Sequence, residues 1–296
     1  MIVEDVIIIG AGPAGLAAAL QLKRYGYKMK IFESSQVGGL LWNAYIMENY
    51  PGFPNGIPGP ELAQIFSKHV KSFGIEITKE RVVGISWKDD LFHVKTSSGV
   101  YISRTAVIAS GTKSRMLTQI DIPADLRDKV IYEIKSILHI EGKQIIIVGA
   151  GDAAFDYALS LSECNFVTIL NRSEKLKCLP LLWNRAISRP NITYLANTTL
   201  SILSGTAKNG ITAECINSAG TLTLHADYIV GAIGRDPQID FLTKSFLQQS
   251  SVLEKRSILY YIGDVKNGLF RQTAISVGNG ISAAMSIYQI LRKNID

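Results

Sequence analysis

The chain has 296 residues, of which 47% are hydrophobic and 19% are charged, and its formal net charge is +6. This length predicts two domains, or one domain with a large insertion, and the composition is that of a globular protein with a substantial core. The lysines and arginines are scattered, and no run of about 18 apolar residues lacks a charge. We therefore expect neither a nucleic-acid-binding surface nor a transmembrane helix.

The termini and the cysteines indicate an intracellular chain. The first strand begins almost at the initiator methionine without a secretory leader, so a cytoplasmic location is expected. Cys164, Cys178 and Cys215 show no CxxC spacing, which argues against disulfides and against a zinc site, and no metal is expected. The mild positive charge is either an ordinary surface bias or a feature suited to an acidic partner.

The first half of the chain shows a βαβ opening followed by a long loop and several short strands. Its expected elements are a strand at 5–10, a helix at 14–25, a strand at 28–33, a Gly- and Pro-rich loop at 37–60, a helix at 61–74, and strands at 75–78, 81–87, 91–96, 100–102 and 105–109. Long loops inside compact domains are usually functional.

The second half repeats this order. Residues 113–143 have no clear assignment, and 128–141 fit a helix or a strand equally well. The expected elements after them are strands at 144–148 and 166–170 around a helix at 152–163, strands at 192–196, 199–203, 211–215, 221–224, 227–232 and 258–262, and a helix at 273–291.

Matching turns at Gly111 and Gly234 make the two halves an approximate internal repeat. The predicted fold is therefore α/β, with two Rossmann-like, three-layer ββα dinucleotide-binding domains, the second nested in the first. The expected boundaries are 1–112 and 235–296 for the outer domain and 113–234 for the nested domain.

The sequence VIIIGAGPAG carries a dinucleotide-binding fingerprint between the first strand and the first helix. Gly10 permits the tight turn, Gly12 lets the backbone approach a pyrophosphate, and Gly15 lets the helix pack closely on the strand. The helix N-terminus supplies free N–H groups and partial positive charge to the phosphates. Glu33, 23 residues after Gly10, can bond ribose hydroxyls. The alternative is that these glycines form a structural turn that binds no nucleotide.

A second fingerprint, IIIVGAGDAA, contains Gly149, Gly151 and Ala154. Arg172 lies 23 residues after Gly149, where a guanidinium suits the 2′-phosphate of NADPH, and Lys177 is a second candidate phosphate contact. Alternatively, Arg172 is a solvated residue at the end of a strand, and Glu174 bonds the ribose of NADH. Two dinucleotides in one chain suggest electron transfer between them.

The tail sequence GDVKNGLFRQTA fits the closing segment of a flavin site. Asp264, after Gly263, can bond a ribityl hydroxyl. The helix that begins near Thr273 can direct its positive end at the N1–C2=O edge of the flavin, where it stabilises negative charge on the reduced ring. The alternative is a simple turn before a terminal helix.

Over its full length the chain resembles low-molecular-weight thioredoxin reductases. The resemblance rests on GAGPAGLAAAL, FESSQVGGLL, ENYPGFPNGIPGPEL, ASGT, IIIVGAGDAAFDYALSL, VTILNRSEKLK, GAIGRDP and YIGDVKNGLFRQTAISVGNGISAA. It implies FAD in the outer domain, NAD(P)H in the nested domain, and a homodimer. For FAD it implies Gly10, Gly12, Gly15, Glu33, Gly39, Asn49, Asp264, Gln272 and Ala274, to which we add Gly111, Gly263 and Thr273. For the nicotinamide nucleotide it implies Gly149, Gly151, Ala154, Arg172 and Lys177.

The chain departs from this family at its redox centre. The family places a CxxC just before the second fingerprint, whereas the corresponding stretch here, DKVIYEIKSILHIEGKQ, has no cysteine. Without a dithiol the chain cannot reduce thioredoxin by exchange chemistry. The family's arginine-rich phosphate motif is reduced to NRSEKLK, which leaves NADPH and NADH open, and Leu40 replaces a glutamine that the family often has near the flavin.

Several residues near these motifs have two possible roles. Cys178, in a basic neighbourhood, is either a reactive thiol of lowered pKa or an inert residue. His139 is either a proton donor or structural. Trp42 and Tyr45 either flank the flavin edge or belong to the core.

The favoured function is an FAD-dependent NAD(P)H oxidoreductase without a catalytic side chain of its own, in which hydride passes from nicotinamide to flavin. Its expected acceptor is a ferredoxin- or flavodoxin-type protein, a quinone, a small disulfide or oxygen. The alternatives are a non-catalytic flavin- and nucleotide-binding redox sensor or regulatory subunit, and a reductase whose thiols come from a partner chain. Because no dithiol has to alternate with the nucleotide at the flavin, we expect the nested domain to rotate little or not at all.

Overall fold

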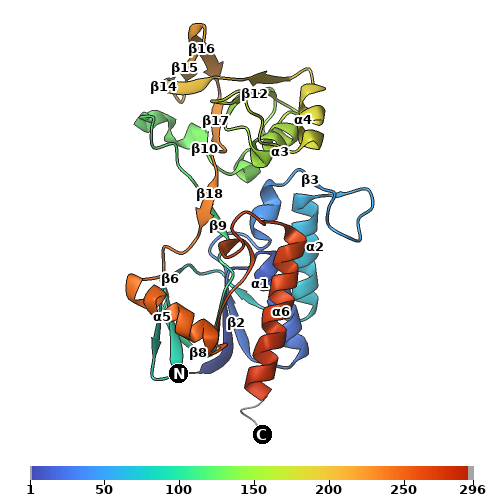
Figure 1. Cartoon of the computed structure of the whole chain (residues 1–296), viewed down its shortest axis with the longest axis vertical. Helices are drawn as coiled ribbons and strands as arrows, with labels where there is room; N and C mark the ends of the chain where they lie inside the picture. Colours follow the sequence, from blue (N-terminus) through green and yellow to red (C-terminus); the bar gives the residue numbers. More distant parts are fainter. Residues whose placement is uncertain (1, 293–296) are drawn as a thin grey trace. The chain divides into compact units, whose positions relative to one another are not determined.

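The computed structural model of the chain describes residues 2–292, and these divide into two compact units. The first unit comprises Met1–Trp42, Ile46–Lys113 and Pro237–Asp296, and the second comprises Asn43–Tyr45 and Ser114–Asp236. Each unit is an α/β layer structure with its own sheet and its own core (Figure 1). The short segment Asn43–Tyr45, which the sequence placed in the outer domain, makes its contacts in the second unit.

The first unit is built on a mixed sheet with the strand order β5-β2-β1-β8-β7-β6, to which β19 adds by pairing with β8. Its strands are β1 (Val3–Ile9), β2 (Met29–Phe32), β5 (Ile77–Thr78), β6 (Val82–Lys88), β7 (Leu91–Thr96), β8 (Val100–Ile108) and β19 (Leu259–Tyr261). β5, β2, β1, β8 and β19 are parallel, whereas β8, β7 and β6 form an antiparallel meander.

Both faces of this sheet are covered, which explains the apolar run of β1 at residues 6–9. Val6 and Ile8 point into one core with helices α1 (Pro13–Arg24) and α6 (Thr273–Arg292). Ile7 and Ile9 point into a second core with residues of β6, β7 and helix α5 (Lys244–Lys255). Successive side chains of β1 therefore point to opposite faces of the sheet and contribute to two separate cores.

The second unit repeats this plan with a parallel sheet in the order β10-β17-β11-β12-β13. Its strands are β10 (Val130–Ile131), β11 (Gln144–Val148), β12 (Phe166–Leu170), β13 (Ile192–Leu195) and β17 (Tyr228–Gly231). Along β11, Ile145 and Ile147 pack with helix α3 (Asp152–Leu161) and helix α4 (Pro180–Ile187), whereas Ile146 faces the other core. That second face is covered by an antiparallel sheet of β14 (Thr199–Thr206), β15 (Gly210–Asn217) and β16 (Gly220–Ala226).

The remaining elements are short, and several correct the sequence-based assignment. The predicted strands 100–102 and 105–109 are one strand, β8, and residues 113–143 hold β9 (Thr112–Ser114), β10 and the 3-10 turns η2 (Ala124–Lys129) and η3 (Ile134–Ser136). β9 pairs with β18 (Arg235–Pro237), and both strands lie where the chain passes between the units. Further unpredicted features are helices α4 and α5, and the β3 (Ile46–Met47)–β4 (Ile57–Pro58) pair before helix α2 (Gly59–Ser72). Two further 3-10 turns are η1 (Gly39–Asn43) and η4 (Gly263–Val265).

Helix α6 is long and apolar enough, by length and composition, to span a membrane. That is weak evidence, because core helices of soluble proteins meet the same criteria. One face of α6 packs against α1 within the first unit, where Ala283, Ala284 and Ile287 are buried in the core (Figure 1).

Candidate functional site

The two fingerprints form the same turn, and both first glycines are required by geometry. Gly10 has φ +108° and Gly149 has φ +125°, a region that L side chains rarely adopt. A Cβ on Gly10 would also collide with the carbonyl oxygen of Ala109, and a Cβ on Gly149 with that of Ala232. Ala109 directly follows β8, and Ala232 directly follows β17. The two halves of the predicted internal repeat therefore share this contact as well.

The second glycine of each fingerprint faces open space. A Cβ on Gly12 or on Gly151 would meet no atom within 4 Å, and neither helix that follows has a side-chain cap. Both helix N-termini therefore keep a clear approach to their N–H groups, which is the arrangement that binds a pyrophosphate. A Cβ on Gly15 would strike the Gly10 carbonyl, whereas the second turn accommodates the buried Ala154.

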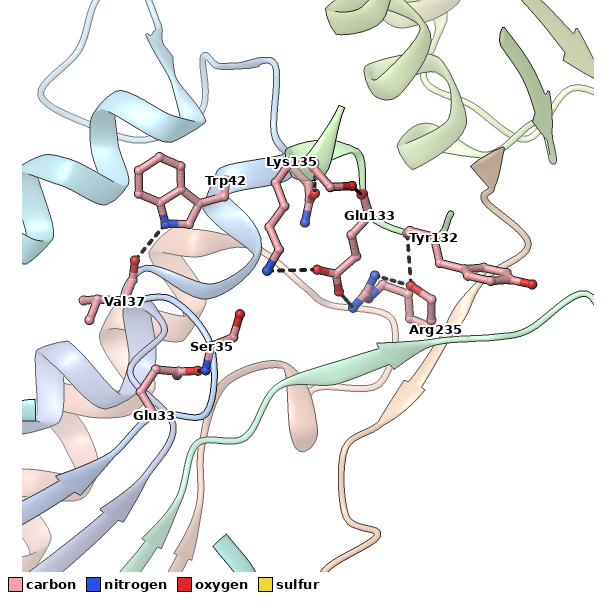
Figure 2. A network of polar contacts seen from close by, with 11 residues as sticks. Glu33, Ser35, Val37, Trp42, Tyr132, Glu133, Lys135 and Arg235 are labelled. Atoms are coloured by element: carbon pink, nitrogen blue, oxygen red, sulfur yellow. Dashed lines mark hydrogen bonds and ion pairs between the residues drawn. The ribbon is translucent and has the colours of Figure 1, made fainter. Parts of the chain in front are cut away.

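The Glu33 carboxylate is fixed beside the first fingerprint. Its Oε2 accepts a hydrogen bond from the backbone N of Ala11 at 2.9 Å, and its Oε1 accepts one from the backbone N of Ser35 at 2.8 Å (Figure 2). β2 thus delivers an oriented acid to the strand end where a ribose would lie. The residues present fit an adenine dinucleotide at this place.

The other residues predicted for FAD all lie in the first unit. Asn49 and Gln272, far apart in sequence, are joined by a hydrogen bond of 2.8 Å from Asn49 Nδ2 to Gln272 Oε1. Gly39 begins η1 and approaches Gly12, since a Cβ on it would lie 3.3 Å from the Gly12 Cα. Thr273 and Ala274 open α6, and Gly111 occupies a left-handed turn with φ +65° next to open space.

Two residues of α6 that the sequence analysis did not single out, Asn279 and Ser276, hold the Gly263–Asp264 turn. Asn279 Oδ1 accepts a hydrogen bond from the Gly263 N at 3.2 Å, and Ser276 Oγ donates to Asp264 Oδ1 at 3.2 Å. Gly280 allows α6 to touch α1 closely. The repeated small and polar residues of α6 indicate a closely packed helix face. The sequence could not show what this face contacts, because the partners lie in the Gly263–Asp264 turn and in α1.

In the second unit the loop 171–179 folds back onto the fingerprint. Gly151 and Lys177 form a parallel β-bridge, and Asp152 Oδ1 accepts a hydrogen bond from the Leu179 N at 2.8 Å. Asn171, which is buried, shapes the loop through hydrogen bonds to the Lys175 carbonyl at 3.2 Å and to the Tyr194 hydroxyl at 2.8 Å. The role of Asn171 was missed, because one of its partners, Tyr194, lies 23 residues further along the chain.

The charged side chains of this loop are exposed. The solvent-exposed charged residues are Arg172, Glu174, Lys175 and Lys177. The loop therefore presents a mainly cationic edge next to the open Gly151 turn, where an anionic nucleotide would be attracted.

The stretch that lacks the CxxC is occupied by an ion-pair network. Arg235 NH2 lies 3.0 Å from Glu133 Oε1, Lys135 Nζ lies 3.4 Å from Glu133 Oε2, and Arg235 NH1 donates to Ser114 Oγ at 2.7 Å (Figure 2). Burial by itself would raise the pKa of Glu133, but Arg235 and Lys135 hold that pKa below its usual value. The network ties the η3 segment to β9 and β18 and contains no redox-active group.

The two aromatic residues that the sequence left ambiguous are packed differently. Trp42 donates its indole N–H to the Val37 carbonyl at 2.8 Å and packs on the core cluster around Leu41 (Figure 2). Tyr45 lies in the second unit, where its hydroxyl donates to Glu163 Oε1 at 2.7 Å and accepts from Arg189 NH2 at 2.9 Å.

The Tyr45 backbone also contacts a buried acid. Its N–H donates to Asp156 Oδ2 at 3.0 Å. Burial raises the pKa of Asp156 to about 6, and the nearby Asp152 adds to the increase, whereas the Tyr45 hydrogen bond lowers it. The charge of the Asp156 carboxyl group is therefore expected to change near pH 6.

The three cysteines form no disulfide within the described residues 2–292. All three are free: Cys164 is exposed, Cys178 is partly buried and Cys215 is buried. Burial and the Asp152 charge raise the pKa of Cys178, so the hypothesis of a lowered pKa is wrong. His139 is exposed. No group of three or more His, Cys, Asp or Glu residues in the described part of the chain could hold a metal ion.

A Cys178→Ser variant is therefore expected to keep the redox behaviour of the chain. A thiol with a raised pKa is mostly protonated at neutral pH and a poor nucleophile. Turnover of NADPH with an artificial acceptor, measured before and after treatment with a thiol-alkylating reagent, should be the same for the wild type and the variant. Inactivation of the wild type alone by alkylation would show that this cysteine takes part.

Comparisons with known proteins agree with this architecture. A profile described as "Pyridine nucleotide-disulphide oxidoreductase" matches residues 4–278. The thioredoxin reductase of Treponema pallidum (strain Nichols) is 30% identical, over 95% of this chain and 94% of that protein. A Clostridium pasteurianum protein, the "34.2 kDa protein in rubredoxin operon", is 28% identical over 95% of each chain. The crystal structure of T. acidophilum thioredoxin reductase superposes with a TM-score of 0.86 at 27% identity, covering 99% of both chains.

Proposed function

Because the chain belongs to the pyridine nucleotide-disulphide oxidoreductase family, we propose that it is an FAD-dependent NADPH oxidoreductase that delivers electrons to an acceptor other than a dithiol of its own. The family implies binding of FAD and of NAD(P)H. The finer assignments, namely the preference for NADPH, the site residues and the acceptor, are proposals supported by the observations below.

The first unit is proposed to hold FAD. The open Gly12 turn at the start of α1 receives the pyrophosphate, and Glu33, held by Ala11 and Ser35, receives ribose hydroxyls. Asp264, in η4 and hydrogen-bonded to Ser276 of α6, is proposed to accept a hydrogen bond from a ribityl hydroxyl. Bound FAD supplies the electron transfer between nicotinamide nucleotide and acceptor, and the chain supplies binding, orientation and electrostatics.

The second unit is proposed to hold NADPH. The Gly151 turn receives the pyrophosphate, and the loop bridged to it at Lys177 brings two exposed cations, Arg172 and Lys177, to the end of β12. A guanidinium and an ammonium are suited to a 2′-phosphate, whereas the exposed Glu174 would repel it. The loop has three exposed cations, since Lys175 adds to Arg172 and Lys177, against one acid, and this excess favours NADPH over NADH.

The observation that carries the proposal is a contrast. Both nucleotide-binding turns are complete, whereas the segment 128–144, where related reductases place their CxxC, contains no cysteine. Glu133, Lys135 and Arg235 fill that segment with an ion-pair network, and the chain's three cysteines show no CxxC spacing. Thiol–disulfide exchange needs a thiolate as attacking group. The acceptor must therefore take its electrons without a dithiol of this chain.

We propose a small acidic electron-carrier protein of the ferredoxin or flavodoxin type as the acceptor. The net charge of +6 favours encounter with an anionic partner. The relative from Clostridium pasteurianum is named for its place in a rubredoxin operon. A quinone and a small disulfide are the competing acceptors.

The purified protein is expected to be yellow and to lose its visible flavin absorbance rapidly when mixed anaerobically with NADPH. Absorbance should return on addition of oxidised ferredoxin or flavodoxin, and a quinone or glutathione disulfide tested in parallel identifies a competing acceptor. The same flavoprotein mixed with NADH serves as the internal comparison. A yellow protein that neither nucleotide bleaches would contradict the enzyme and favour a redox sensor.

We also propose that the chain acts as a homodimer, as its resemblance implies. A groove of about 390 Å³ lies between α1, α2 and α6 in the first unit. Its walls are largely apolar and include Leu16, Leu20, Phe66, Phe73 and Ile281, of which Phe73 and Ile281 are exposed. An exposed apolar groove of this kind is a suitable interface for a second copy.

A further inference from the structure

We propose that Asn279 and Ser276 of α6 are positioning residues for FAD, which set the Gly263–Asp264 turn against the start of α1. This inference rests on the proposed function, since it assigns these residues to the same flavin site. It goes beyond the motif itself, because both residues act through the turn.

Asn279 holds the backbone of the turn. Its Oδ1 accepts a hydrogen bond from the Gly263 N at 3.2 Å, across 16 residues of sequence. Gly263 has φ +71°, and a Cβ on it would lie only 2.8 Å from the Cβ of Ala14. The turn thus lies directly on the first residues of α1, and Asn279 restrains it there from the other side.

Ser276 holds the side chain of the turn. It is buried, with 6% of its surface exposed, and its Oγ donates to Asp264 Oδ1 at 3.2 Å. A hydroxyl that donates to one carboxylate oxygen restricts rotation of the carboxylate. Asp264 therefore presents a defined acceptor geometry, which a ribityl hydroxyl needs for a short, directional bond.

The same stretch of α6 also fixes α1. A Cβ on Gly280 would strike the Ala14 carbonyl and would lie 2.9 Å from the Ala18 N and 3.0 Å from the Ala17 Cβ. The two helices are thus in direct backbone contact where α1 begins. Residues 276–280 therefore connect the two halves of the proposed FAD site: the pyrophosphate turn at Gly12 and the carboxylate at Asp264. Loss of either hydrogen bond, from Asn279 or from Ser276, should increase the rate of FAD release, whereas the apolar packing of α1 against α6 should persist.

The test compares the release of FAD from holoproteins. Asn279→Leu keeps the side-chain volume and removes the acceptor, whereas Asn279→Asp keeps an oxygen in the same place. FAD released on dilution is followed by the recovery of its fluorescence. We expect Asn279→Leu to release FAD about tenfold faster than the wild type, as loss of one hydrogen bond allows, and Asn279→Asp to stay within about twofold of it.

A serine pair provides the second measurement, which also serves if Asn279→Leu does not fold. Ser276→Ala should release FAD several times faster. Ser286→Ala removes an exposed serine of the same helix, whose hydroxyl donates to the helix backbone at Ser282, and should match the wild type. The inference is overturned if release is unchanged in Ser276→Ala and Asn279→Leu, or if Asn279→Asp releases FAD as fast as Asn279→Leu. A wild-type chain that takes up no FAD would instead refute the proposed function itself.

Discussion

Replacement of Arg172 by alanine is expected to raise the KM for NADPH about 10- to 100-fold and to leave the KM for NADH within about twofold of the wild type. A hydrogen-bonded guanidinium–phosphate pair contributes about 1.5–3 kcal/mol, and every 1.4 kcal/mol is about tenfold in affinity. NADH lacks the 2′-phosphate, so it loses nothing when the guanidinium is removed.

The structure favours this selectivity because Arg172 is exposed at the end of β12 and the Gly151–Lys177 bridge anchors the loop that follows it. Removing the side chain should leave that loop in place, since Asn171 and Asp152 provide its internal hydrogen bonds. Steady-state kinetics with both nucleotides and one artificial acceptor measure the effect. Lys208→Ala, which removes an exposed cation from the β14–β15 turn, controls for net charge. Equal losses for NADPH and NADH would show that Arg172 does not contact the phosphate.

Replacement of Asp156 by asparagine is expected to stabilise the protein at pH 8 by at most about 3 kcal/mol and to have no effect near pH 4. The pKa of Asp156 in the folded chain is raised by burial from 3.8 to about 6. The folded state therefore holds this proton more tightly than the unfolded state. Stability from this group is fully present below about pH 4, is lost as pH rises through about 6, and stays lost above it.

Asparagine keeps an oxygen that can accept the Tyr45 N–H and removes the cost of a buried charge. Urea unfolding at a series of pH values, followed by circular dichroism, measures the difference in stability. Glu163→Gln is the matched control, because Glu163 also contacts Tyr45 but its side chain is 56% exposed. That variant should change stability little at any pH. A pH-independent effect of Asp156→Asn would show that the carboxyl does not titrate with a raised pKa.

The fold class and both fingerprints could be predicted from sequence because their signals are local. Gly10 and Gly149 are required by φ and by one neighbouring carbonyl, and β1 and β11 are recognisable by their apolar runs at residues 6–9 and 145–148, which are typical of strands buried on both faces. Helix α5 was missed although it had a local signal, since Thr243 caps it by accepting a hydrogen bond from the Phe246 N at 3.2 Å. Its polar sequence, KSFLQQSSVLEK, obscured the apolar face.

Sequence alone determined that this chain has two nucleotide turns, a family resemblance and no dithiol, since each of these is a matter of residue type and spacing. Tertiary structure decided which distant groups meet: Glu133 with Arg235 across 102 residues, Tyr45 with Asp156 across 111, and Asn279 with Gly263. It also decided that the pKa of Cys178 is raised, because burial and the Asp152 charge act through space. Desolvation and hydrogen bonding depend on what lies within a few ångströms, and only the folded chain defines those neighbours.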